Sequence, residues 1–131
     1  MCNITPQLRG YDKYGSGAFL APRGTAKHKG IDFIVLCGAE VLALAAGKVT
    51  KLGYCYSDDL SYRYVQVTDQ AGNDVRYFYV QPGVAEGDKV TLGTCLGLAQ
   101  DLDTRYKGIT PHVHFEVLRD GSVVNPNEYL A

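Results

Sequence analysis

The residues Pro111-His112-Val113-His114-Phe115-Glu116-Val117-Leu118 alternate between polar and apolar side chains, which is typical of a β-strand. Successive side chains of a strand point to opposite faces of a sheet, so His112 and His114 share one face while Val113 and Phe115 share the other. We expect the apolar face to enter the core and both imidazoles to project into one cleft. The stretch therefore predicts a strand with a polar site on one face and core on the other.

Similar short segments precede this strand. Residues 62–68 and 75–80 flank the turn Gln70-Ala71-Gly72-Asn73, and together they predict a β-hairpin. We interpret residues 39–52 as a pair of strands that turns at Ala46-Gly47. The spacing of these segments is that of an all-β protein rather than of one with alternating helices and strands.

The rest of the chain adds turns and one further short strand. Residues 90–92 form that strand, Asp120-Gly121 is a turn, and Asn125-Pro126 closes the chain into a short tail. The weak helical candidate, residues 99–106, lacks regular apolar spacing. We therefore predict an all-β fold, with an antiparallel sheet curled into a partly open barrel or sandwich. Residues 1–131 would form a single domain.

Composition and charge exclude several classes of function. The chain has 13 basic and 14 acidic side chains and a net charge of −1, which argues against nucleic acid as a partner. No apolar run reaches the length of a membrane span, so we expect no membrane insertion. Separately, we expect the protein to be a monomer. Residues 1–9 lack the apolar core of a secretory signal. The protein would stay where it is made, leave by another route, or begin after a removed leader.

The four cysteines, Cys2, Cys37, Cys55 and Cys95, form no C-x-x-C pair, which argues against a thiolate zinc site. We interpret them as free, buried thiols that behave as small hydrophobic side chains. One or two disulfides are the alternative if the protein works outside a cell, and the sequence does not choose among the pairings.

All three histidines fall inside two compact patterns that are typical of metal sites. His112 and His114 form H-x-H, and His28 and Asp32 form H-x-x-x-D, with Gly30 permitting a bend between them. Imidazole and carboxylate are both zinc ligands, and three such ligands with an open position form a catalytic site. The alternatives are structural histidines in the strand and a loop histidine beside a solvated Asp32.

Five segments of the chain resemble motifs of the lysostaphin-like zinc endopeptidases, which cut peptide bonds in bacterial peptidoglycan. The first is the entry strand with His28 and Asp32, and the last is Asn125-Pro126 with Tyr129-Leu130. Between them, residues 41–49 resemble the family's V-x-A-x-x-x-G-x-V segment, residues 87–93 its G-x-x-V turn, and residues 111–117 its P-H-L-H-F-E strand.

This resemblance implies a set of roles. His28, Asp32 and His114 would bind one zinc ion (Zn2+) per chain, and His112 would act as the general base that orients or deprotonates the attacking water. The substrate would be a peptide of peptidoglycan, so the protein would act on the cell wall, in the periplasm or outside a cell. The alternative is a catalytically silent zinc-binding domain of the same fold that serves in recognition or signalling.

Tyr79 departs from the family pattern, because it stands where a further catalytic histidine is expected. Tyrosine is a neutral hydrogen-bond donor at pH 7, so Tyr79 could stabilise the oxyanion but would be a poor base. The alternative is a ring that only packs on the sheet. The segment around Tyr79 (residues 78–82), residues 108–114 and the turn at residues 12–17 resemble a subgroup that includes leukocyte cell-derived chemotaxin 2 and small endopeptidases of phages and prophages. Release by phage lysis or carriage on a virion would bring such an enzyme to the wall.

Two smaller features concern carboxylates. Glu116 shares a face with His114, so it could accept a hydrogen bond from a zinc-ligating imidazole, or it could be solvated or ion-paired. Asp58-Asp59 could bind a cation, although we favour an ordinary hairpin loop at this position.

Overall fold

The computed structural model describes residues 7–8, 11–12, 15–16, 22–23, 26–27 and 30–130. His28 lies outside these residues, so its predicted role stays a prediction. No helix among the described residues is long and apolar enough to cross a membrane.

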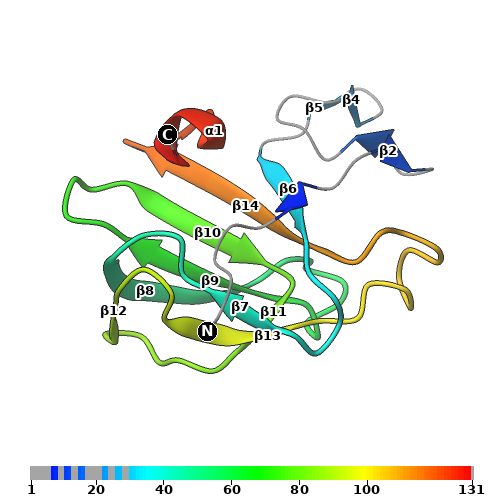
Figure 1. Cartoon of the computed structure of the whole chain (residues 1–131), viewed down its shortest axis with the longest axis horizontal. Helices are drawn as coiled ribbons and strands as arrows, with labels where there is room; N and C mark the ends of the chain where they lie inside the picture. Colours follow the sequence, from blue (N-terminus) through cyan, green and yellow to red (C-terminus); the bar gives the residue numbers. More distant parts are fainter. Residues whose placement is uncertain are drawn as a thin grey trace.

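A large antiparallel sheet forms the body of the protein (Figure 1). Its strands run in the order β1, β6, β14, β10, β9, β8 and β12, and β15 pairs with β14. Their bounds are β1 Gln7–Leu8, β6 Ile31–Ile34, β14 His112–Arg119, β10 Asp74–Phe78, β9 Arg63–Thr68, β8 Gly47–Tyr54, β12 Lys89–Val90 and β15 Ser122–Val124.

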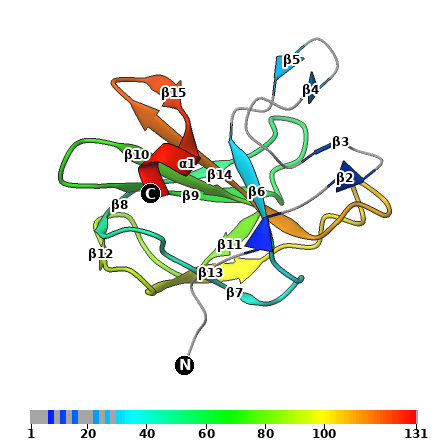
Figure 2. The ribbon, with the colours of Figure 1, turned by 45° about the horizontal axis from the view of Figure 1, so that its top comes forward.

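A small sheet of three strands lies against one face of the large sheet, as the view in Figure 2 shows. Its order is β11 (Val80–Pro82), β13 (Cys95–Ala99) and β7 (Glu40–Leu42). Two hairpins, β2 (Tyr11–Asp12) with β3 (Gly15–Ser16) and β4 (Pro22–Arg23) with β5 (Ala26–Lys27), lie at the side of the large sheet near β6. The predicted all-β, partly open barrel or sandwich is confirmed.

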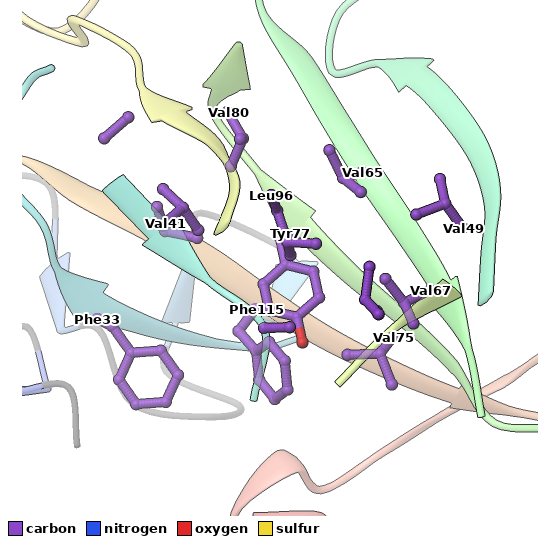
Figure 3. Packing of buried hydrophobic residues seen from close by; sticks show 14 of the residues in the cluster. Phe33, Val41, Val49, Val65, Val67, Val75, Tyr77, Val80, Leu96 and Phe115 are labelled. Carbon is purple, nitrogen blue, oxygen red and sulfur yellow. The ribbon is translucent and has the colours of Figure 1, made fainter. Parts of the chain in front are cut away.

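The hydrophobic core fills the space between the two sheets. Its largest fully buried side chains are Tyr77 and Phe115, whose rings meet edge to face with centroids 5.2 Å apart (Figure 3). The hydroxyl of Tyr77 accepts a hydrogen bond from the backbone N–H of Leu44 at 3.0 Å, so this polar atom is satisfied inside the core. As predicted, Val113 and Phe115 are buried on this face of β14.

Tyr79 is the point at which the chain leaves one sheet for the other. β10 ends at Phe78 in the large sheet, and β11 begins at Val80 in the small one. Tyr79 between them has a φ of 73°, a left-handed conformation that costs a non-glycine residue about 1–2 kcal/mol. Backbone hydrogen bonds to Arg63 (2.8 Å) and from Gln100 (2.9 Å) hold it there. The sheet junction therefore determines where the Tyr79 side chain points.

The structure confirms some predicted elements and corrects others. The hairpin of β9 and β10 is confirmed, with Thr68 opposite Asp74. Residues 39–52 do contain two strands, but β7 and β8 belong to different sheets and do not pair, because β7 bonds to β13 and β8 to β9 and β12. The short strand predicted at residues 90–92 is β12, which lies at Lys89–Val90 and pairs with β8.

The weak helical candidate forms no helix, in line with its lack of regular apolar spacing, and a short helix lies in the tail, for which we predicted no secondary structure. Residues 99–106 form no helix: β13 ends at Ala99, and the loop that follows makes isolated turns around Leu102. The predicted tail contains a short helix, α1 (Pro126–Leu130), which begins at a proline whose fixed φ suits the first helical position. Its Tyr129 hydroxyl donates to Asp69 at 2.7 Å and ties the helix to the large sheet.

The described cysteines are not the buried thiols that we predicted. Cys37 and Cys95 are exposed and Cys55 is half-buried. None of these three forms a disulfide, and Cys2 lies outside the described residues.

Gly30 is required by the close approach of β6 and β14 rather than by a bend. A Cβ at this position would lie 2.1 Å from the carbonyl oxygen of Phe115. Because that obstacle is backbone, the strands would have to separate. We expect Gly30→Ala to lower the free energy of unfolding in urea by about 3 kcal/mol, at the upper end of overpacking costs.

Gly72→Ala is the matched control, because Gly72 has a φ of +88° but nothing lies within 4 Å of the position that an added methyl group would take. We expect it to cost only the backbone strain of about 1 kcal/mol. Hydrogen exchange should show lost protection in β6 for Gly30→Ala alone. Equal costs for the two variants would contradict the role given to Gly30.

Candidate active site

Asp32 and His114 lie directly opposite each other on β6 and β14. Their side chains project from the face of the large sheet opposite to Val113 and Phe115, as the alternation of β14 predicts. The Oδ1 atom of Asp32 is 2.9 Å from Nδ1 of His114, and Asp32 is only 2% exposed. A carboxylate buried so completely needs a partner of opposite charge or a metal ion.

His112 faces the other oxygen of the same carboxylate. Its Nε2 lies 3.5 Å from Oδ2 of Asp32, and its Nδ1 lies 2.7 Å from the carbonyl oxygen of Thr110. Since a carbonyl only accepts, Nδ1 of His112 carries the hydrogen. This bond orients the ring so that Nε2 points toward Asp32. The structure thus brings together three of the predicted site residues.

Glu116 completes the arrangement around His114, in agreement with one of the two roles that we considered for it. Its Oε1 lies 2.9 Å from Nε2 of His114. Burial lowers the pKa of His114, but the hydrogen bonds and charges of Asp32 and Glu116 outweigh burial and raise the pKa above its usual value.

The donor set fits a divalent metal such as zinc. Both ring nitrogens of His114 face a carboxylate at 2.9 Å, Nδ1 that of Asp32 and Nε2 that of Glu116. A metal held by Asp32 would bind the Nδ1 atom beside it, and Glu116 behind the ring would then be the usual supporting contact. The described residues contain no group of three side chains arranged to hold a metal ion. The predicted third ligand, His28, is outside that part of the chain.

Tyr79 lies beside His112, where the missing histidine was expected. The two rings meet edge to face with centroids 5.5 Å apart. Burial raises the pKa of Tyr79 well above the usual value, so its hydroxyl stays protonated and neutral at physiological pH. Its Oη is 3.0 Å from Oη of Tyr56. Tyr79 therefore packs its ring against His112, and its hydroxyl contacts that of Tyr56.

Sequence reasoning missed Tyr56, Arg105 and Tyr106, which come from the loops 55–62 and 100–111. Oη of Tyr56 is 2.9 Å from Oη of Tyr106, and Cζ of Arg105 is 3.6 Å from the centroid of the Tyr56 ring. These loops are joined only in space, so no spacing along the chain reveals the cluster. The richness of residues 54–64 in tyrosine was the available signal.

Asp58 and Asp59 contact Arg105, at 3.6 and 3.9 Å, which is consistent with the loop role that we favoured for them. Asp59 also accepts hydrogen bonds from the backbone and side chain of Ser61. Tyr62 joins the two loops, because its hydroxyl donates to the carbonyl of Asp101 at 2.7 Å.

Comparison with known proteins gives a family match over most of the chain. The family described as Peptidase family M23 matches residues 26–126. Myeloid protein 1 of Gallus gallus is 31% identical over 118 residues, which cover 87% of this chain and 36% of that protein. The chain thus spans about a third of the length of this curated relative.

Solved structures of similar fold include two peptidases and a prophage-encoded M23 protein. The catalytic domain of lysostaphin, the antimicrobial peptidase of Staphylococcus simulans, is 22% identical with a TM-score of 0.64, over 92% of this chain and 88% of that one. A mutant catalytic domain of the prophage-encoded M23 protein EnpA of Enterococcus faecalis is 20% identical with a TM-score of 0.70, over 98% and 95%. A zinc-containing peptidase of Vibrio cholerae is 24% identical with a TM-score of 0.61, over 93% and 38%. These likenesses confirm the predicted fold.

Cys55 lies behind the site, where its thiol donates to the carbonyl of Arg63 at 3.2 Å, the same carbonyl that accepts from the N–H of Tyr79. Burial raises the pKa of Cys55 to about 11. The thiolate is the reactive form, so Cys55 should resist alkylation until the pH approaches 11.

We therefore expect iodoacetamide at pH 8 to modify Cys37 and Cys95 quickly and Cys55 slowly, with the Cys55 rate rising steeply between about pH 9 and the raised pKa of about 11. Peptide mapping by mass spectrometry measures each site. Rapid labelling of Cys55 at pH 8 in the folded protein would contradict this position for its thiol.

Proposed function

The chain belongs to peptidase family M23, and from that premise we propose that it is a zinc-dependent endopeptidase that hydrolyses peptide bonds in the stems or cross-bridges of peptidoglycan. The observation that carries the proposal is the buried carboxylate of Asp32, whose two oxygens face His114 and His112. Each imidazole is anchored on its far side, by Glu116 and by the Thr110 carbonyl, so both are oriented before any substrate binds.

Asp32, His114 and His28 would hold one zinc ion. When bound, zinc supplies a Lewis acid that polarises the scissile carbonyl and lowers the pKa of water toward about 7. Glu116 supports this role, because it lies at Nε2 of His114 and would hold the hydrogen there when Nδ1 binds the metal. The resemblance of the entry strand to the family motif supports the inclusion of His28.

His112 would be the general base and then the general acid. Its Nδ1–H donates to the Thr110 carbonyl, so Nε2 is the ring atom that can accept a proton. Nε2 faces the same carboxylate as His114, which supports a role beside the residues proposed to hold zinc. It would take the proton of the attacking water and deliver it to the amine of the departing peptide.

Tyr79 would donate a hydrogen bond to the oxyanion of the tetrahedral intermediate. The raised pKa of its phenol keeps the hydrogen in place at neutral pH. One such donor contributes roughly 2.7–4 kcal/mol to the transition state in other enzymes. A buried phenol cannot serve as a base at this pH, so proton transfer would rest on His112 alone.

We also propose that the protein is a lysin of a phage or prophage that acts on the cell wall. The support is the resemblance of residues 78–82 and 108–114 to small phage endopeptidases. A prophage-encoded protein of similar fold is consistent with this source.

A second candidate function is a catalytically silent zinc-binding domain that recognises a peptide, a glycan or a receptor. The specific observation in its favour is Tyr79, which replaces a base by a neutral donor. The similarity to Myeloid protein 1, at 31% identity, keeps a non-bacterial role in view. The two functions differ in whether peptide bonds are cut.

Hydrolysis of purified peptidoglycan sacculi separates these functions. We expect the zinc-loaded protein to release soluble fragments with new amino groups, measured by amine labelling and mass spectrometry of the fragments. A chelator should abolish the release, and added zinc should restore it. Zinc-loaded protein that binds sacculi but produces no new amino groups would favour the silent domain.

Variants of the histidines test the separate roles. We expect His28→Ala and His114→Ala to lose zinc, measured as metal per chain by mass spectrometry after gel filtration. His112→Ala should keep its zinc and lower kcat by about 10²- to 10⁴-fold, the usual contribution of a general base. Loss of zinc from His112→Ala, with a folded circular dichroism spectrum, would show that the ligands are assigned wrongly.

A further inference from the structure

We propose that Tyr56 and Arg105 are positioning residues that orient the hydroxyl hydrogen of Tyr79 toward the reacting groups. The inference rests on the proposed function, in which Tyr79 is an oxyanion donor. It concerns a chain of hydroxyls that crosses from the loop 100–111, through the loop 55–62, to the sheet junction at Tyr79.

Three phenol oxygens form this chain in single file. Oη of Tyr106 is 2.9 Å from Oη of Tyr56, which is 3.0 Å from Oη of Tyr79. Both distances are those of good hydrogen bonds. Each phenol has one hydrogen to donate, so the order of donation along the chain decides where the Tyr79 hydrogen points.

Arg105 lies at the outer end of the chain and can only donate. Its Nε–H donates to Oη of Tyr106 at 3.3 Å, so Tyr106 is an acceptor there. The positive charge also repels the hydroxyl hydrogen of Tyr106 and turns it toward Tyr56. Tyr56 then donates to Tyr79, whose own hydrogen is directed away from Tyr56. Hydrogen bonds aligned in this way strengthen one another.

The position of Arg105 is set by several contacts. Its guanidinium stacks on the Tyr56 ring at 3.6 Å, while Asp58 and Asp59 approach it at 3.6 and 3.9 Å. The hydroxyl of Tyr62 holds the start of the same loop through the Asp101 carbonyl and lies 2.9 Å from Oγ1 of Thr104. These contacts hold the guanidinium of Arg105 beside the hydroxyl chain and restrict the conformations of its side chain.

At the inner end of the hydroxyl chain, the backbone and the ring of Tyr79 are both held in place. Its backbone is held in the left-handed region by hydrogen bonds to Arg63 and from Gln100, and its ring lies against His112. The remaining freedom of the residue is rotation of the hydroxyl. With Tyr56 as donor, that rotation directs the hydrogen away from Tyr56 and leaves it available to an oxyanion at the proposed site.

A double-mutant cycle tests this coupling. We expect Tyr79→Phe to lower kcat for sacculus hydrolysis by about 10²-fold, as loss of one oxyanion donor does. Tyr56→Phe should lower kcat by about tenfold, the size of one neutral hydrogen bond, with KM unchanged. In the Tyr79→Phe background, Tyr56→Phe should have no further effect. Equal effects of Tyr56→Phe in both backgrounds would overturn the proposal.

Matched substitutions separate orientation from general damage. Arg105→Met should lower kcat about as much as Tyr56→Phe, and Arg105→Lys, which keeps the charge, should retain more activity. Tyr54→Phe is the control, because the Tyr54 side chain is 51% exposed and contacts Arg63 rather than the three hydroxyls. Full activity of Arg105→Met would count against the proposed role of the hydroxyl chain.

A second measurement does not depend on hydrolysis. In full-length protein labelled with tyrosine carrying 13C at Cζ, the resonance of Tyr79 is assigned from its loss in Tyr79→Phe. We expect Arg105→Met and Tyr56→Phe to shift this resonance and Tyr54→Phe to leave it in place. If wild-type protein cuts no peptidoglycan, the proposed function fails while this shift still supports the hydroxyl chain. If the Tyr79 resonance does not move in either Arg105→Met or Tyr56→Phe, the proposed hydroxyl chain is wrong.

Discussion

The pairing of β6 with β14 is the constraint on which the rest of the site depends. It sets Asp32 opposite His114 and brings His112 to the second oxygen of the same carboxylate. A shift of register by one residue would turn both imidazoles into the core and move Val113 and Phe115 to the face that carries the site. Gly30 allows the two strands to approach closely beside this pair, since any side chain there would strike the Phe115 carbonyl. The strand pairing that packs the core therefore also places the site.

The second constraint is the junction at Tyr79. A strand that stays in one sheet alternates its side chains regularly, but this chain passes from β10 to β11 and must change direction between them. The positive φ of Tyr79 makes this change and aims the ring at His112. Backbone strain of this kind persists only where the surroundings hold it, and here the bonds to Arg63 and Gln100 do so. The ring of Tyr79 is placed by the junction between the sheets, and its hydroxyl contacts Tyr56 of the loop 55–62.

Sequence alone could predict those features that depend on local alternation. The period of two in residues 112–117 identified the strand, its buried face and the shared face of the two histidines, and the turn at residues 70–73 identified the hairpin. It could not assign β7 and β8 to different sheets, because both follow the same local pattern and the choice depends on partners such as β13. Tyr56 and Tyr106 were missed for the same reason: they are 50 residues apart along the chain and meet only after the sheet has formed.

Stability alone does not explain why polar residues are buried on the face of β14 that carries His112 and His114. A buried carboxylate costs several kcal/mol of desolvation, and an isolated pair seldom recovers more than that cost. Asp32 is nevertheless 2% exposed, with an imidazole beside each oxygen, and Tyr79 adds backbone strain close to it. Apolar residues at these positions would pack against the same sheet without either penalty.

Each anchoring contact, from Glu116 to His114 and from Thr110 to His112, restricts a ring to the orientation in which one nitrogen faces Asp32. Oriented imidazoles of this kind would serve proton transfer beside a metal, and this is the physical reason to propose an enzyme rather than a silent domain.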